Sequence, residues 1–427
     1  MVTHLADVEN ADAAELHGRS PRCSSARALR GSETLRPQPA RNVAIAPLPG
    51  LRQPGAPRPN LTPSRGPATK ETPIYRQHPW RPSTALRSGR TEDRLATVRP
   101  ERSAVEGRPS SPKRSRTTKT GVFLPISGRA ATPETLRQAA QNAEAWGFDS
   151  IWAADRIIIP WRIDTHYPYA RGGAFIVPPD RPFLDSLTCL TFLAACTSRV
   201  ELGISVLVLP YRQPLVWAKI AVTLDHLSNG RFILGVGVGW MEEEFRALQA
   251  PFKDRGRRTD EQLKVLKELW SAEHASFSGR FYEFEDIAFL PKPTRAGGIP
   301  IWVGGEGEHA QRRAGRHGDA WFPYFVRIEP GELARRFDNA RRHATAAGRD
   351  PESLHLNCCL PVEVTREPVA QEPDRLAGTP AQLVEAIARY RDAGVEHLAL
   401  QFMVPRWPDR LEQMQQFAEE TLPHLQA

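Results

Sequence analysis

The sequence predicts a (β/α)8 TIM barrel with an inserted hairpin and a lid loop, preceded by a disordered basic N-terminal arm. Downstream of Gly121, eight short apolar segments alternate with eight segments of helical periodicity over about 305 residues, the count of such a barrel. A doubly wound parallel sheet is the structural alternative. Its fingerprint, G-x-G-x-x-G with an acidic residue about 20 positions later, is not met by the run Gly235-x-Gly237-x-Gly239.

The arm comprises residues 1–118 and the barrel domain residues 119–427. Residues 1–120 hold 16 of the 39 prolines, and 22 Lys and Arg against 10 Asp and Glu; this balance of +12 leaves −4 for the rest of a chain of net charge +8. Isolated apolar residues without a period cannot offset the entropy of folding, so we expect the arm to be disordered. The alternatives are a basic tether for nucleic acid or a protein partner, centred on residues 111–116, and a native translation start near Lys119. We expect no nucleic acid on the barrel domain.

Cysteine usage and hydropathy predict a cytoplasmic protein. The 5 cysteines include no C-x-x-C pair and no histidine at metal-ligand spacing, so we expect reduced thiols and no metal. Cys189 and Cys196 are expected to pack on one apolar helix. No apolar run of about 18 residues is present to span a membrane, and the acidic N-terminus does not read as a secretory signal.

Caps and turns define the first elements of the barrel domain. A buried strand at 121–125 is followed by a helix that begins after Thr132, with a proline at its first position, and ends at Gly147. The second strand covers 150–154. Residues 157–182 are rich in aromatic residues and proline, and a loop of this length predicts a lid or a binding loop.

The middle of the domain begins with an apolar helix at 183–197 and continues with a βαβ unit. Its strands cover 200–210 and 231–239, and its crossover helix covers 214–228. The remaining elements keep the same alternation. Helices are expected at 242–248, 259–270, 308–317, 330–347, 380–394 and 409–425, strands at 299–305, 320–322, 354–364 and 395–402, and the inserted hairpin at 277–289.

The ligand site is expected at the carboxyl ends of the strands, where parallel α/β proteins bind ligands. The first strand ends in Leu124-Pro125-Ile126-Ser127, not in the His-x-His pair of metal-dependent hydrolases. Apart from Asp155 and the run Glu242-Glu243-Glu244, which suits a helix start, the strand ends lack the carboxylate pair of a retaining glycosidase.

Small residues and exposed backbone dominate these strand ends, with aromatic residues around them. The set comprises Gly203, Ser205, Gly235, Gly237, Gly239, Gly304, Gly305, Trp240, Trp321, Phe322 and Tyr324. Such a pocket suits a large flat ring that carries its own reactivity. Gly304-Gly305 before a helix also suits a phosphate group.

Several motifs taken together resemble the luciferase-like monooxygenase family. They are Leu202-Gly203-x-Ser205-Val206-Leu207, Asp225-His226-Leu227-Ser228-x-Gly230-Arg231, Leu234-Gly235-Val236-Gly237-x-Gly239-Trp240, Glu243-Glu244-Phe245, Arg258-Thr259-x-Glu261, Phe277-x-Gly279-x-Phe281-Tyr282, Pro300-Ile301-Trp302-Val303-Gly304-Gly305 and Gly378-Thr379-Pro380. The resemblance covers Gly121 to the C-terminus. Within the family it is closest to the branch that uses the deazaflavin coenzyme F(420).

The resemblance implies a barrel that holds a flavin or deazaflavin across the strand ends, with a bulge of the third strand behind the ring. In members that use coenzyme F(420) the bulge contains a non-prolyl cis peptide, which matches Ser205-Val206. Asp155 matches the acidic residue beside the ring. Gly304 and Gly305 match amides on the phosphate side.

Two positions depart from the family pattern. Arg156 stands where many members have a histidine, and Trp240 stands where the sugar-phosphate-oxidising members have a proton-donating glutamate, so these catalytic roles are not transferred. Asp155 and Arg156 are the candidate catalytic residues. Arg156 either fixes an anionic substrate or a ring oxygen, or forms a structural ion pair with Asp155.

The expected function is hydride transfer between coenzyme F(420) and a small apolar or aromatic substrate under the 157–182 loop. The first alternative is an FMN-dependent monooxygenase that uses oxygen and reduced flavin from a separate flavin reductase, and the second is a non-catalytic flavin-binding protein. The cluster Arg255, Arg257 and Arg258 favours coenzyme F(420), because it can bind the polyglutamate tail. Family members are commonly dimers, so we expect a homodimer.

Overall fold

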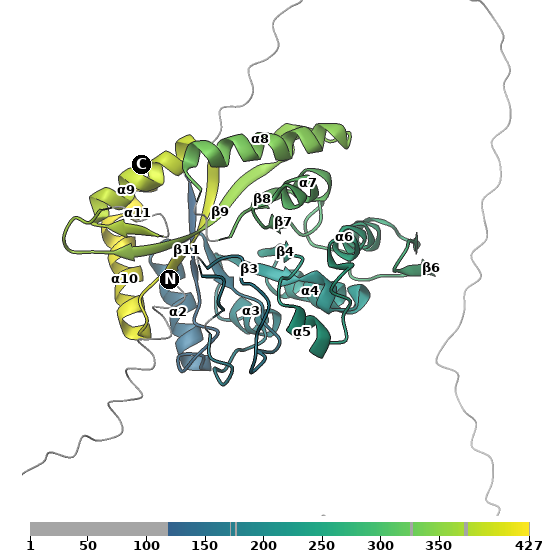
Figure 1. Ribbon diagram of the computed structural model, residues 1–427, viewed down its shortest axis with the longest axis horizontal. Helices are drawn as coiled ribbons and strands as arrows, with labels where there is room; N and C mark the ends of the chain where they lie inside the picture. The colour runs from purple at the N-terminus through teal and green to yellow at the C-terminus, as the bar shows by residue number, and fades with distance from the viewer. Residues whose placement is uncertain (1–117, 171, 176, 325–327, 371–374, 427) are drawn as a thin grey trace, which may run out of the picture. The chain divides into compact units, whose positions relative to one another are not determined.

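The computed structural model describes residues 118–426 except 171, 176, 325–327 and 371–374, and this part of the chain is a barrel of parallel strands enclosed by helices (Figure 1). The barrel confirms the expected fold class. The doubly wound alternative is wrong because the sheet closes: β8 (Ala320–Phe322) pairs with β9 (His355–Val364). Residues 1–117, with the arm and its basic 111–116 segment, lie outside the described residues.

Eight parallel strands follow one another around the barrel in the order β1-β2-β3-β4-β7-β8-β9-β11, and β11 pairs with β1. Their ends lie within two residues of the expected segments, since each is a short apolar run bounded by turn residues. The other bounds are β1 Lys119–Phe123, β2 Ser150–Ala153, β3 Glu201–Val208, β4 Phe232–Gly237, β7 Ile301–Gly304 and β11 Val395–Phe402.

Helices cover the outer face of the strands, and side-chain caps fix several helix starts. Thr132 accepts the amide of Thr135, and Thr379 and Gln382 form a capping box. The bounds are α2 Pro133–Ala145, α3 Ser186–Ala194, α4 Pro214–Leu227, α5 Glu242–Ala247, α6 Arg255–Ser271, α7 Glu308–His317, α8 Pro330–Ala346, α9 Pro380–Asp392, α10 Trp407–Glu420 and α11 Leu422–Gln426.

Four elements differ from the expectation. The last helix is two helices, α10 and α11, separated at Thr421, and α6 begins four residues earlier than expected. A short strand, β10 (Leu376–Gly378), extends the sheet beside β9, and its three residues are too few to show a period. Cys196 lies beyond the end of α3, so Cys189 and Cys196 do not share a helix. The inserted hairpin is confirmed as β5 (Ala275–Ser278) and β6 (Glu283–Ile287).

Apolar side chains fill two regions on opposite sides of the strands. The larger core lies between strands and helices, and the smaller fills the barrel interior with Phe123, Trp152, Ile233, Trp302, Ala320, Phe322, Cys359 and Ala399. The ring centroid of Trp152 lies 5.1 Å from those of both Trp302 and Phe322. The interior is therefore a packed core, and the two ends of the barrel are separate surfaces.

The described cysteines Cys189, Cys196, Cys358 and Cys359 form no disulfide bond with one another. Within the described part of the chain, no helix combines the length and the apolar character that crossing a bilayer requires.

Candidate active site at the C-terminal mouth

The end of the barrel at which the parallel strands have their carboxyl ends is called the C-terminal mouth. Asp155 follows β2 at this mouth and connects β2 to the end of β3. Its carboxylate accepts two bonds from the Arg212 guanidinium, at 2.7 and 2.8 Å, one from the Val208 amide at 3.0 Å and one from the Ser186 hydroxyl at 3.3 Å. Burial lowers the pKa of Arg212, but the charge and hydrogen bonds of Asp155 outweigh it and raise that pKa overall. Asp155 therefore holds the β3 end in place through a bidentate ion pair.

Arg156 was expected either to contact a ligand or to form an ion pair with Asp155. The expected ion pair with Asp155 is wrong, because Arg156 pairs with another carboxylate. Its guanidinium forms a buried ion pair with Glu244 in α5 and lies over the rings of Phe175 and Trp240, 5.1 and 5.5 Å from their centroids. Asp155 already accepts four hydrogen bonds, two of them from Arg212. Glu244 therefore provides the negative charge that neutralises Arg156. Whether Arg156 also contacts a substrate stays a prediction.

Glu244 is the central acceptor of this mouth. Its fully buried carboxylate also accepts the amides of Ile157 and Ile158, at 3.0 and 3.2 Å, and the hydroxyl of Tyr211 at 2.8 Å. Burial, and then the charge of Glu244, raise the pKa of Tyr211, which keeps its proton. From the sequence, Glu244 was expected to suit a helix start and was part of a family motif, but no contact in the site was predicted for it. Its place in the sequence next to the apolar Phe245 could have indicated that Glu244 is buried, since both residues are buried in α5.

The loop 157–182 covers the mouth through a second glutamate and a set of aromatic contacts. Glu243 accepts the amides of Asp164 and Thr165, at 2.8 and 3.0 Å, and the Thr165 hydroxyl at 2.7 Å. Tyr167 and Phe175 pack against Trp240 at centroid distances of 4.8 and 5.3 Å, and Tyr169 packs against Tyr324 at 5.3 Å. The first turn of α5 thus anchors the loop.

The bulge expected in β3 is present. Pairing of β3 with β4 shifts register between Ile204 and Leu207, and the Ser205-Val206 peptide is cis, as the resemblance implied. The Ser205 hydroxyl is buried and has no hydrogen-bond partner among the described residues.

The glycines beside the bulge have a packing reason of their own. A Cβ on Gly237 would lie 2.5 Å from one Val206 methyl, and a Cβ on Gly304 would lie 2.9 Å from the other. Gly235 likewise faces the carbonyl oxygen of Ile204. These positions therefore accommodate the Val206 side chain, a packing role that the sequence did not predict.

The end of β7 leads into a helix that has no side-chain cap. Gly305 adopts φ +104°, and Gly307 precedes α7 without a side chain to accept its first amides. The Trp321 indole donates to the Gly305 carbonyl at 2.8 Å and fixes this turn. A helix start of this kind attracts anions.

The basic cluster on α6 divides into three different environments. Arg255 donates to the Gly239 carbonyl at 3.2 Å, next to the end of β4, and burial lowers its pKa. Arg257 is exposed and pairs with Asp254, and Arg258 lies over the Phe281 ring at 4.3 Å. Only Arg255 of the three contacts a strand-end residue of the mouth.

The C-terminal mouth brings together Asp155, Ser205, Val206, Gly237, Gly239 and Gly304, and these positions lie in the region that the luciferase-like monooxygenase family matches, residues 118–372. The chain belongs to the luciferase-like monooxygenase family. An uncharacterized protein of Mycobacterium tuberculosis is 30% identical over 292 residues, which are 66% of this chain and 93% of that protein. An F(420)-dependent glucose-6-phosphate dehydrogenase of Amycolatopsis mediterranei is 29% identical over 339 residues, 69% of this chain and 95% of that enzyme.

Solved structures of other proteins share the barrel. An F(420)-dependent secondary alcohol dehydrogenase in complex with an F(420)-acetone adduct superposes with a TM-score of 0.59 at 19% identity, covering 73% of this chain and 100% of that one. A monooxygenase from Streptomyces bottropensis superposes with a TM-score of 0.55 at 22% identity, covering 72% and 99%. At these identities the likeness shows the fold alone.

The residues at the mouth fit a flat cofactor with an anionic end. The bulge carries the partnerless buried hydroxyl of Ser205, while the uncapped start of α7 and the guanidinium of Arg255 supply donors suited to phosphate or carboxylate. Both buried carboxylates, Asp155 and Glu244, are neutralised by arginines. The arrangement suits binding and orientation of a ring that brings its own redox chemistry.

Proposed function

We propose that the chain is an oxidoreductase that binds coenzyme F(420) at the C-terminal mouth and exchanges a hydride with a small apolar or aromatic organic molecule. The coenzyme would supply the hydride chemistry when bound. The ring of the coenzyme would lie against Ser205 and Val206. Its other contacts would be with backbone atoms of four glycines that carry no side chain in the way, Gly237, Gly239, Gly304 and Gly305.

Arg255 carries this proposal. It is the arginine of the α6 cluster that reaches the mouth, and its anchor on the Gly239 carbonyl leaves further N–H donors of a pre-oriented guanidinium. The first turn of α6 also packs against α7, because Arg313 of α7 pairs with Asp260 and donates to the Gly256 carbonyl. Arg255 and the start of α7 therefore belong to two helices that pack together, which supports a site for the phosphate and carboxylates of coenzyme F(420).

The lid favours an uncharged aromatic or apolar substrate. Tyr167, Phe175 and Trp240 pack together over the mouth, and Arg156 lies over two of these rings with its charge neutralised by Glu244. Removal of water by this cover strengthens the electrostatic interactions beneath it. The Tyr211 hydroxyl, bonded to Glu244, holds a proton at a defined atom of the site.

The relatives support a deazaflavin without fixing the substrate. Proteins described as F(420)-dependent glucose-6-phosphate dehydrogenases match at 29% and 35% identity, the latter over 200 residues of a Kineococcus radiotolerans enzyme. Trp240 stands where the resemblance places the proton-donating glutamate of such enzymes, so we do not propose a sugar phosphate as substrate.

Turnover tests the proposal. The full-length chain is incubated without oxygen with oxidised or reduced coenzyme F(420) and a panel of aromatic and aliphatic alcohols, aldehydes and enones, and the cofactor absorbance is followed. We expect a substrate-dependent change that Arg255→Ala weakens and Arg257→Ala leaves within about twofold. Substrate oxidation that needs reduced FMN and oxygen would establish the monooxygenase alternative. Absence of turnover with either cofactor would favour a non-catalytic binding protein.

A further inference from the structure

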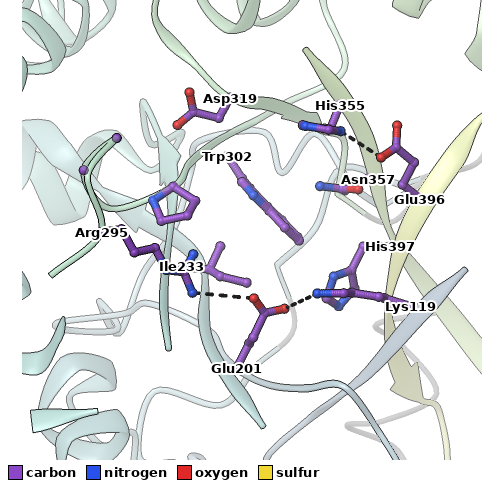
Figure 2. Close-up of a pocket in the computed structure, with 13 residues that line it drawn as sticks. Lys119, Glu201, Ile233, Arg295, Trp302, Asp319, His355, Asn357, Glu396 and His397 are labelled. Carbon is purple, nitrogen blue, oxygen red and sulfur yellow. Dashed lines mark hydrogen bonds and ion pairs between the residues drawn. The ribbon is translucent and has the colours of Figure 1, made fainter. Parts of the chain in front are cut away.

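The opposite end of the barrel contains a pocket that the proposed reaction does not use. It has a volume of about 560 Å³, within the size range of small-molecule sites, and the N-terminal ends of the barrel strands line it (Figure 2). The rings of Trp152, Trp302 and Phe322 fill the interior between this pocket and the C-terminal mouth. The pocket is therefore an independent surface.

Trp302 forms an aromatic wall of this pocket. Its side chain belongs to the interior core, where its ring centroid lies 5.1 Å from that of His397 and 5.2 Å from that of Phe322. Figure 2 shows Asn357 of β9 and His397 of β11 extending toward this ring. Because Trp302 packs on three sides, it offers a flat ligand a rigid surface.

Asn357 has a buried amide whose oxygen lacks a partner within the described residues. It is 3% exposed, and its Oδ1 atom makes no hydrogen bond within the described residues. Its oxygen and nitrogen can exchange places by rotation, so the amide can present either a donor or an acceptor to the pocket. An unsatisfied buried amide costs folding free energy, and a ligand with a matching edge would remove that cost.

His397 adds a donor beside this amide. Its Nε2 atom lies 2.7 Å from the Ser150 hydroxyl, which already accepts the indole N–H of Trp152 at 2.7 Å. Burial, and then the charge of Lys119, lower the pKa of His397 to about 3, so the ring is neutral. Among the described residues the Ser150 hydroxyl has no other acceptor for its proton, so this proton is assigned to the bond with Nε2, and the hydrogen of the neutral ring is then on Nδ1.

The charged side chains around the pocket already have ion-pair partners, and Asp319 has its partner, Arg349, outside the lining at 3.9 Å. Glu201 pairs with Lys119 at 3.2 Å and with Arg295 at 3.6 Å, and His355 bonds to Glu396 at 2.7 Å. These pairs surround the polar centre in Figure 2. A neutral ligand can enter without breaking them, whereas a strongly charged one would have to compete with them.

We propose that this N-terminal pocket binds a neutral planar heterocycle with an amide-type edge, of the nucleobase or nicotinamide class. The ring would lie against Trp302, its N–H and carbonyl would pair with the Asn357 amide, and the His397 N–H would donate to a ring acceptor.

Matched ligands test the proposal on the full-length chain. Uracil and nicotinamide are titrated by calorimetry and by saturation-transfer NMR, each against its methylated counterpart, 1,3-dimethyluracil or N,N-dimethylnicotinamide, which has no N–H on the amide edge. We expect at least one of the two parent compounds to bind, and its methylated counterpart to bind about tenfold more weakly or worse.

Two variants locate the site. Asn357→Leu should weaken binding about tenfold or more while leaving the melting temperature unchanged or higher, because it removes an unpaired buried amide. Arg255→Ala, at the opposite mouth, should leave binding within about twofold. If Asn357→Leu does not fold, His397→Phe removes the neighbouring donor instead. The proposal fails if neither parent compound binds, if methylation has no effect, or if Arg255→Ala abolishes binding and Asn357→Leu does not.

Discussion

Arg156 and Glu244 form a buried ion pair across the C-terminal mouth, with Arg156 at the end of β2 and Glu244 in the first turn of α5. Glu244 also binds the two backbone amides that follow Arg156, so one carboxylate fixes both the guanidinium and the start of the lid loop. Loss of its charge would leave a buried cation without a partner, which makes this pair the most sensitive contact of the site.

Glu244→Gln should lower the free energy of unfolding by about 3 to 5 kcal/mol, because Arg156 keeps its charge in a buried place. The lid loop would lose order at the same time, so turnover with coenzyme F(420) should also fall. Denaturant unfolding and limited proteolysis of residues 157–182 measure the two effects. The matched control is Glu242→Gln in the same helix turn, where an exposed pair with Arg246 contributes about 0 to 1 kcal/mol. Equal losses in both variants would contradict the role of Glu244.

Asp155 and Arg212 should show strong energetic coupling. Arg212→Met leaves the buried Asp155 without a cationic partner, and Asp155→Asn leaves Arg212 with only the half-exposed Asp185 carboxylate at 4.0 Å, whereas the double variant removes both charges. We expect each single variant to be destabilised by about 3 kcal/mol and the double variant to be less destabilised than the sum of the two. Additive losses in a double-mutant cycle would show that the bidentate contact contributes little.

Gly237→Ala should destabilise the barrel by about 1 to 3 kcal/mol, because the new Cβ would lie 2.5 Å from a Val206 methyl. Val206→Ala removes that methyl and should recover part of the loss in the double variant. Gly331→Ala, in α8, is the control: its Cβ meets nothing within 4 Å, and alanine in a helix is expected to be neutral or stabilising. If Val206→Ala gave no recovery, the packing role of Gly237 would be wrong.

His397 should make the fold sensitive to mild acid. The unfolded residue takes up a proton near its ordinary pKa of 6.5, whereas the folded ring stays neutral down to about 3, so the unfolded state binds more protons in between. Lowering the pH through this window should reduce the free energy of unfolding by up to about 1.4 kcal/mol per pH unit.

The variant His397→Gln should flatten this dependence between pH 6.5 and 5, measured by urea unfolding at each pH. His274→Gln serves as control, because the pKa of exposed His274 is raised by its hydrogen bond to Asp286 and not lowered by burial. An unchanged slope in His397→Gln would show that this imidazole is not the source.

The fold was predictable because each barrel strand is a short apolar run that ends at a recognisable turn. Helix α7 (Glu308–His317) and strand β8 (Ala320–Phe322) have the expected ends, since Gly307 and Gly318 flank the helix. The break between α10 and α11 was not predictable, because apolar periodicity continues through Thr421.

The site was predictable in its location and not in its contacts. The strand-end rule indicated the region around Asp155 and the β3 bulge, but the partners of the arginines depend on which chains meet across the mouth. Asp155, expected as the ion-pair partner of Arg156, pairs with Arg212 instead, and no contact had been predicted for Glu244. The N-terminal pocket had no sequence signal at all, because Trp302, Asn357 and His397 converge only when the barrel closes.

The most direct measurement of the proposed function is a side-by-side titration of the full-length chain with coenzyme F(420) and with FMN, followed by fluorescence and calorimetry. We expect coenzyme F(420) to bind at least about tenfold more tightly than FMN, and Arg255→Ala to weaken it about tenfold while Arg257→Ala changes it less than twofold. Tight FMN binding without binding of coenzyme F(420) would contradict the proposal.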